Sequence, residues 1–370
     1  MNIYPQFLEL LSAAIWNRRA NMTLFREMDE RKWQDLIQLT KKQRVIGLIS
    51  DAIQTLPKER QPPKAIRIKL LLLTEKIEEA NLSLNKKLIK ISEEYNRKEF
   101  KFALLKGQGN AVFYPNPLHR TSGDIDLYLY RKDDYERAKK WIRNRNFSHD
   151  LESIHHIGFV YESAHIENHR YVTYFTKKKY DRLLACAINR IIENDAFEWI
   201  RIENTPIRVL PVEFNAFYIY LHLFHHFISN GIGFRQVCDW LLILSENDSR
   251  IDKKRFTELA EQFDLLKAMQ TTAYACIKYL GTKPEIFPFE LKQDTKYTDL
   301  LITDILEGGH FGYHRNGMEK KRSLWAGRWF RYTVAVKRAF KFGFIAPSHI
   351  FLVPLSKAIT RLKLTLKRKE

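Results

Sequence analysis

The feature that most constrains the fold of this chain is a change in the spacing of its apolar residues, from helical to strand-like and back. Residues 5 to about 97 carry apolar side chains at helical spacing, and the stretch from 64 to 99 contains neither Gly nor Pro. That stretch predicts one long helix or two stacked ones. Strand-type patterns begin at residue 100, and helical spacing returns at residue 211. An order of helices, strands and helices predicts an α+β protein.

The strand-like part resolves into short pieces. FKFALLKG is an apolar run of strand length that stops at Gly107, and DIDLYLY alternates from Asp124 to Tyr130. An amphipathic segment, RKDDYERAKKWIRNRNF, separates these from IGFVYES and AHIENHRYVTYF, which again have strand character. We therefore expect a small mixed-sheet α/β domain over residues 98–212. An N-terminal helical region (1–97) and a C-terminal helical bundle with a basic tail (213–370) would flank it.

Composition excludes several classes of protein. With 45% hydrophobic residues the chain can bury a core, so it is not an intrinsically disordered protein. Its three cysteines are far apart and lack the paired spacing of a zinc site or a disulfide framework, so we expect them to be buried. Neither a basic leader nor an apolar run of about 18 residues is present, which favours a cytoplasmic location.

Positive charge is concentrated at the end of the chain. Of the net charge of +19, the segment from Lys320 to Glu370 carries 14 Lys or Arg against a single acid. Basic and aromatic residues alternate there. Such a mixture suits single-stranded nucleic acid, an anionic membrane surface, or a helix face that is merely solvated. The sequence leaves these three interpretations of residues 320–370 open.

The stretch LLKGQGNAVFYPNPLHRTSGDIDLYLY holds the most informative polar residues. Residues two apart on a strand point the same way, so Asp124 and Asp126 share one face while Ile125 and Leu127 point into the core. A lone Asp-x-Asp is usually solvated charge. Here it follows a glycine turn, with Lys106 and Arg120 nearby as cations for phosphate. This context favours a site for a divalent ion and phosphate.

These residues resemble the "uncharacterised nucleotidyltransferase" family of the DNA polymerase β-like nucleotidyltransferase superfamily. The resemblance rests on a Leu-Lys-Gly turn, an Arg-x-x-Gly-Asp-x-Asp strand, an acidic-x-His segment (HIENH), and a His-rich helix followed by GFRQVCDW. It covers residues 100 to 245. The corresponding positions here are Leu105, Lys106, Gly107, Tyr114, Pro115, Pro117, Arg120, Gly123, Asp124, Ile125, Asp126, Leu127, Glu167, His169, His222, His226, Arg235 and Asp239.

The resemblance implies a polymerase β-like fold and transfer of an NMP group from an NTP to an acceptor hydroxyl, with Mg²⁺ or Mn²⁺. It implies that Asp124, Asp126 and Glu167 are catalytic and hold the metal. The implied substrate-binding residues are Lys106, Gly107, Arg120, Gly123, His169, Arg235 and Asp239. The acceptor, whether a small molecule, sugar, RNA or protein, stays open. The superfamily turn is usually Gly-Ser or Gly-Gly, so Lys106-Gly107 departs from that pattern.

Other motifs carry less information. His222 and His226 have a spacing that suits zinc, but the glutamate of an HExxH motif is missing, which favours a packing role. Metal ligation by His155, His156, His165 and His169 is a minor alternative. Kinase and P-loop motifs are lacking. Besides the enzyme, a nucleic-acid-binding or membrane-peripheral protein with a degenerate catalytic domain remains an alternative function.

Overall fold

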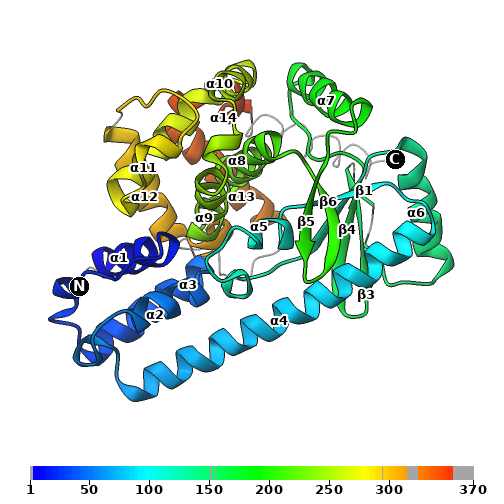
Figure 1. Cartoon of the computed structure of the whole chain (residues 1–370). Helices are drawn as coiled ribbons and strands as arrows, with labels where there is room; N and C mark the ends of the chain where they lie inside the picture. Colours follow the sequence, from blue (N-terminus) through cyan, green and yellow to red (C-terminus); the bar gives the residue numbers. More distant parts are fainter. Residues whose placement is uncertain (1–2, 151, 154, 294, 315–323, 353–370) are drawn as a thin grey trace.

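The computed structural model describes residues 3–150, 152–153, 155–293, 295–314 and 324–352. A six-stranded sheet lies between a long helix on one side and a body of helices on the other (Figure 1). The expected α+β class, a small mixed sheet flanked by helices, is therefore confirmed. Parts of the basic tail, residues 320–323 and 353–370, lie outside the described residues. Among the helices described, none is both long enough and apolar enough to cross a bilayer.

The N-terminal region is helical. Its α-helices are α1 (Tyr4–Ile15), α2 (Glu30–Gln43), α3 (Ile46–Gln54) and α4 (Lys64–Arg97). The Asp29 side chain caps α2, and Arg44, in a left-handed conformation, ends it. Because the 64–99 stretch lacks Gly and Pro, α4 continues for 34 residues, from the N-terminal helices to the sheet (Figure 1). It forms one helix, not two.

The strand order in the sheet is β3-β4-β2-β1-β6-β5. The strands are β1 (Phe102–Leu105), β2 (Ile125–Leu129), β3 (His156–Tyr161), β4 (Ala164–His169), β5 (Glu198–Ile202) and β6 (Thr205–Val209). Pairing is parallel for β2 with β4 and for β1 with β6, and antiparallel elsewhere. Three helices belong to this region: α5 (Gln108–Ala111), α6 (Lys132–Asn144) and α7 (Lys178–Glu193).

The two faces of the sheet bury different side chains, as strand alternation requires. Ile125, Leu127 and Leu129 of β2 pack with Tyr95 of α4 and Trp141 of α6 in one cluster. On the other face, the helical body covers the sheet. Asp126 of β2 and His165, Glu167 and His169 of β4 lie on that second face and point toward the helical body, whereas Asn168 lies on the first face and bonds to Tyr95.

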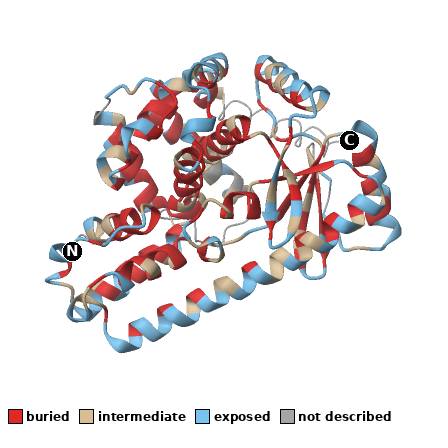
Figure 2. Ribbon diagram, viewed as in Figure 1, coloured by how far each residue is buried: buried red, intermediate tan, exposed pale blue. Residues whose placement is uncertain are grey.

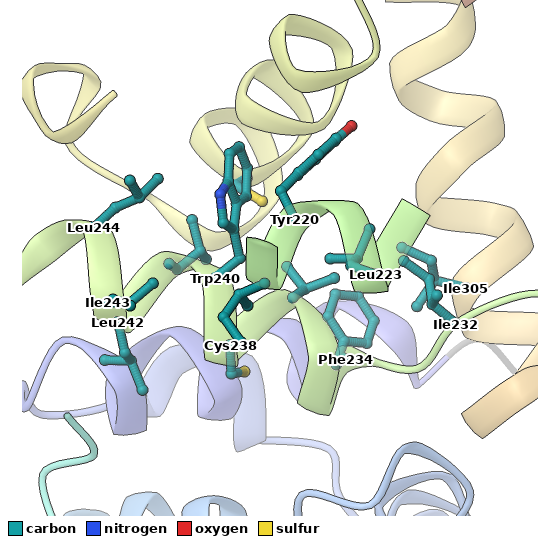
Figure 3. Close-up of a cluster of buried hydrophobic side chains, with 14 of the residues drawn as sticks. Tyr220, Leu223, Ile232, Phe234, Cys238, Trp240, Leu242, Ile243, Leu244 and Ile305 are labelled. Carbon is teal, nitrogen blue, oxygen red and sulfur yellow. The ribbon is translucent and has the colours of Figure 1, made fainter. Parts of the chain in front are cut away.

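The C-terminal region is a bundle built around two central helices. Its α-helices are α8 (Val212–Ser229), α9 (Phe234–Ser245), α10 (Lys253–Gln262), α11 (Leu266–Leu280), α12 (Thr295–Gly308), α13 (Leu324–Phe342) and α14 (Pro347–Ile350). Short 3-10 turns link several elements: Met22–Phe25, Lys58–Arg60, Pro117–His119, Asp248–Arg250, Pro284–Ile286, His310–Gly312 and Gly343–Ile345. Figure 2 shows burial concentrated in α8 and α9. Trp240 of α9 packs against Tyr220 of α8 (Figure 3).

Several details differ from the sequence-based expectations. Cys238 and Cys276 are buried, but Cys186 on α7 is exposed, so the expectation of three buried cysteines was wrong for that residue. The strand character expected through YVTYF ends at His169. The β5–β6 hairpin and α7 were not anticipated. One hydrophobic cluster includes residues of all three expected regions, from Phe7 to Ile350; the division at residues 97 and 212 stays a prediction.

The described part of the basic tail supplies charges to the fold itself. Arg338 of α13 is 3% exposed and pairs with the buried Asp304 of α12, with 2.8 Å between Nη1 and Oδ2. It also donates to the Phe227 carbonyl of α8. At least this cation is therefore committed to packing and not to an external partner.

Candidate active site

The polar residues of the sheet gather on adjacent strands. Asp126 of β2 and Glu167 of β4 are register partners in the parallel pair, and Tyr128 is opposite His169. Because residues two apart share a face, Asp126, Glu167 and His169 all point toward α8 and α9. Asp124 immediately precedes β2 on the same side. Alternation along two neighbouring strands thus concentrates three carboxylates and a histidine.

Asp126 is the buried centre of this group, with 5% of its surface exposed. Its Oδ1 lies 3.0 Å from Lys106 Nζ and 2.9 Å from His169 Nε2. Burial opposes ionisation of Asp126, but Lys106 and His169 outweigh it and hold the pKa of this carboxyl below its usual range. Burial likewise disfavours the cation of Lys106, yet Asp126 raises the pKa of the Lys106 amine. Both groups are therefore charged at neutral pH.

Glu167 links two groups of potential metal ligands. Its Oε2 lies 3.2 Å from His169 Nε2. Ligand atoms of Asp126, Glu167 and His169 lie within 4.8 Å of one another, and so do those of Asp124, His165 and Glu167. Burial opposes ionisation of Glu167, but His169 dominates and the pKa is lowered. Glu167 is therefore an anionic ligand that either group could use.

Asp124 differs from Asp126 in its surroundings. Its side chain is 54% exposed, and its Oδ1 lies 3.5 Å from His165 Nδ1. His165 in turn contacts Asp150 at 3.0 Å through Nε2. Burial, opposed by His165 and reinforced by the negative charges of Asp126 and Glu167, raises the pKa of Asp124. A divalent cation would relieve this repulsion, so the donor set of oxygens and imidazoles fits a metal ion.

The turn after β1 carries unusual backbone angles. Lys106 (φ 46°) and Gly107 (φ 51°) both have positive φ, which costs a lysine about 1–2 kcal/mol. This conformation lets Lys106 reach Asp126. The amides of Gly109 and Asn110 donate to the carbonyls of Lys106 and Gly107. Those two amides are therefore occupied within the turn, which limits how many backbone groups here can hold phosphate.

Arg120 and Asp239 join the β2 loop to α9. Arg120 donates from Nε and Nη2 to the two oxygens of Asp239, at 2.7 and 2.8 Å. The Tyr114 hydroxyl donates to the same carboxylate at 2.7 Å. Asn81 of α4 holds the loop from the other side, donating to the carbonyls of Leu118 and Arg120. The strand that carries the aspartates is thus fixed by α4 and α9.

Arg235 is one turn before Asp239 on α9. Its Nη1 donates to the Thr121 carbonyl at 3.0 Å and lies 3.8 Å from the position that a Cβ on Gly123 would occupy. Burial, together with the neighbouring Arg120 guanidinium, lowers the pKa of Arg235 to about 10. It remains a cation at neutral pH, next to the start of β2.

One cavity of about 1220 Å³ brings these residues together. All ten sequence-predicted site residues line it: Lys106, Gly107, Arg120, Gly123, Asp124, Asp126, Glu167, His169, Arg235 and Asp239. Its volume exceeds the roughly 300–1,000 Å³ typical of a single small-molecule pocket. The cavity is therefore larger than one small ligand requires.

Other lining residues were not anticipated as site residues. Arg44 comes from the end of α2, His310 from the turn after α12, and His225 from α8. Burial, reinforced by Arg235 and Arg44, lowers the pKa of His310 to about 2. The only sequence signal at α8 was its run of histidines, which had favoured a packing role. Arg44 and His310 had no local signal, because each reaches the site only through tertiary packing.

A comparison with protein families identifies the family of this chain. The profile of the family described as "Uncharacterised nucleotidyltransferase" matches residues 29–281, more than half of the chain. No curated protein matches the chain significantly. A crystal structure of an antigenic nucleotidyltransferase-like protein from Paracoccidioides brasiliensis is similar at 9% identity and a TM-score of 0.32, covering 54% of this chain and 93% of that one. On the strength of the profile match, the chain belongs to the uncharacterised nucleotidyltransferase family.

Proposed function

We propose that this protein is a metal-dependent nucleotidyltransferase that transfers an NMP group from an NTP to an acceptor hydroxyl. The observation that carries the proposal is the convergence of Asp124, Asp126 and Glu167 on one face of the sheet, at a large cavity. Family membership supports the same reaction class. Asp124, Asp126 and Glu167 would hold Mg²⁺ or Mn²⁺, which would supply Lewis-acid stabilisation of the charge on the phosphates.

The protein's own residues would orient the reaction. Glu167 belongs to both groups of ligands, so it would offer a carboxylate ligand beside either Asp124 or Asp126. His169 donates to Asp126 or Glu167 and holds their orientation. The acceptor hydroxyl loses its proton to solvent while its oxygen forms a bond to the α-phosphorus, the bond from that phosphorus to the bridging oxygen breaks, and pyrophosphate leaves.

Lys106 has a second role in this scheme. Lys106 Nζ lies 3.0 Å from Asp126 Oδ1, so the ammonium group balances the charge of that buried carboxylate. A bound divalent ion would compete with Lys106 for Asp126. Released from this pair, the ammonium group can neutralise a phosphate oxygen instead.

The test is calorimetric titration of each NTP with Mg²⁺ into the wild-type protein and into Asp124→Asn/Asp126→Asn. We expect saturable, Mg²⁺-dependent binding that the double variant loses. Glu162→Gln is the matched control, because Glu162 is exposed in the turn between β3 and β4, where it pairs with Lys90. Circular dichroism of each variant verifies folding. Equal NTP binding by the wild type and the double variant, or no binding by either, would contradict the proposal.

A further inference from the structure

The end of the cavity next to α9 holds more positive charge than the fold neutralises. The cavity is lined by the carboxylates Asp124, Asp126, Glu167 and Asp239, and three of these belong to the strand cluster. Asp239 uses both oxygens for Arg120. Arg235 and Arg44 line the same cavity, and the one side-chain hydrogen bond described for Arg235 is to the Thr121 carbonyl, a neutral acceptor.

At this cavity, two guanidinium nitrogens lack a hydrogen-bond partner among the described residues. Arg120 is 3% exposed, and its Nη1 has no hydrogen-bond partner among the described residues. The Nε of Arg235 is likewise buried and unpaired in the described part of the chain. A buried donor that stays unpaired costs about 1–3 kcal/mol, and more when it is charged. These atoms are therefore suited to donate to a ligand that enters the cavity.

Neighbouring groups neither neutralise this positive charge nor replace the arginines as donors. His310 stays neutral because burial and the adjacent Arg235 and Arg44 lower its pKa. The first amides of α9, those of Gly233 and Phe234, are already capped by the neutral side chains of Gln236 and Gln43. The helix terminus therefore does not hold the ligand, and the arginine side chains remain as the donors.

We propose that Arg44, Arg120 and Arg235 form an anion subsite that binds a phosphate group beside the strand of aspartates. Arginine presents a planar fork of donors that suits phosphate oxygens. Asp239 and Tyr114 orient Arg120. Arg235 and Arg44 have no carboxylate partner in the described part of the chain, so they add net positive charge to the cavity. Arg235 Nη1 lies beside Gly123, and Gly123 directly precedes Asp124 in the chain. A phosphate bound to Arg235 would therefore lie next to the carboxylate cluster.

The source of the phosphate is either the NTP tail or a phosphorylated acceptor, and naming the NTP tail rests on the proposed function. The β- and γ-phosphates are favoured, because the turn after β1 offers few free amides to hold them. Phosphate binding itself requires neither metal nor catalysis. An experiment can therefore contradict the anion subsite without contradicting the proposed nucleotidyl transfer, and the reverse.

The experiment is calorimetric titration of inorganic tripolyphosphate, with EDTA present, into the wild type, Arg235→Ala, Arg44→Ala and Asp126→Asn. Loss of a charge-assisted hydrogen bond should weaken binding about tenfold or more in each arginine variant. Arg143→Ala is the control, because Arg143 lies on α6, against the opposite face of the sheet. Asp126→Asn should retain tripolyphosphate binding while losing Mg²⁺-dependent NTP binding. Thermal melts of each variant verify folding.

Competition between ATP and tripolyphosphate identifies which molecule supplies the phosphate. ATP that displaces tripolyphosphate from the wild type supports the NTP tail, whereas simultaneous binding of both supports an acceptor phosphate at the same arginines. An unchanged Kd in Arg235→Ala, or no tripolyphosphate binding by the wild type, would overturn the subsite. If the wild type binds tripolyphosphate but shows no Mg²⁺-dependent NTP binding, the result would contradict the proposed function and leave the anion subsite intact.

Discussion

Two partly buried histidines of α8 make stability depend on pH. Burial lowers the pKa of both His225 and His226 to about 3, reinforced by the neighbouring imidazoles of His349 and His155 for His225 and by the Lys106 ammonium for His226. In the unfolded chain both titrate near about 6.5. Between these values the unfolded state binds more protons, so their contribution is complete above about pH 6.5 and is lost as the pH falls.

We predict that the free energy of unfolding decreases by up to about 1.4 kcal/mol per pH unit for each of these histidines between pH 6 and 4. Denaturant titrations at several pH values measure this slope. His225→Gln/His226→Gln should flatten it, whereas His149→Gln, at an exposed position, should not. The same slope in the double variant and the wild type would refute the assignment.

At the residue scale the sequence predicted part of the local geometry of the candidate site. The alternation of DIDLYL predicted that Ile125 and Leu127 are buried, and they are 1% and 0% exposed. It also predicted that Asp124 and Asp126 share a face, but not that one is exposed and the other buried. That difference comes from Lys106 and the helical body, which lie outside the strand. Arg44 was unpredictable because its place in the cavity depends on how α2 packs.

Among the elements, α3 approaches the loop before β2 very closely. A Cβ on Gly47 would lie 2.4 Å from the His119 carbonyl oxygen and 2.6 Å from its Cβ. His119 is also held by Asp51 of α3 and Glu78 of α4, at 2.7 and 2.6 Å. This contact fixes the chain just before Arg120.

We predict that Gly47→Ala destabilises the protein. Alanine in a helix normally gains about 0.5–1 kcal/mol over glycine, but the clash with backbone costs about 1–3 kcal/mol and outweighs that gain. Chemical denaturation compares it with Gly109→Ala, where the nearest atom would be Leu104 Cδ2 at 3.5 Å, an ordinary contact. A Gly47→Ala protein as stable as the wild type would contradict this packing.

Helices were easier to predict than the later strands. The pattern from 252 to 281 contains neither Gly nor Pro before Gly281, yet α10 ends at Gln262 because Asp264 adopts a left-handed conformation (φ 54°). The β5–β6 hairpin has strand alternation in EWIRI and a short turn at Glu203, which was a usable signal. The strand order depends on contacts across more than 100 residues, which no local pattern encodes.

For the whole molecule, the cavity joins segments that are distant in sequence. Arg44 ends α2, Asp126 lies on β2, Arg235 starts α9 and His310 follows α12. We predict that binding of Mg²⁺ and an NTP slows amide hydrogen exchange in all three of the segments 43–47, 120–126 and 233–239. Mass spectrometry measures this protection. Protection confined to residues 105–169 would contradict a site built from all of these segments. The 132–144 helix, on the far side of the sheet, is the internal control.

The contact between α1 and α11 can form only late in the synthesis of the chain. Ser12 of α1 and Trp16, the residue that follows this helix, both donate to the Leu280 carbonyl, at 2.6 and 2.8 Å. During synthesis, α1 leaves the ribosome long before residue 280 exists, at about 5–20 residues per second. For that interval part of its apolar face has no partner. The N-terminal helix can therefore complete its folded contacts only after α11 has been synthesised.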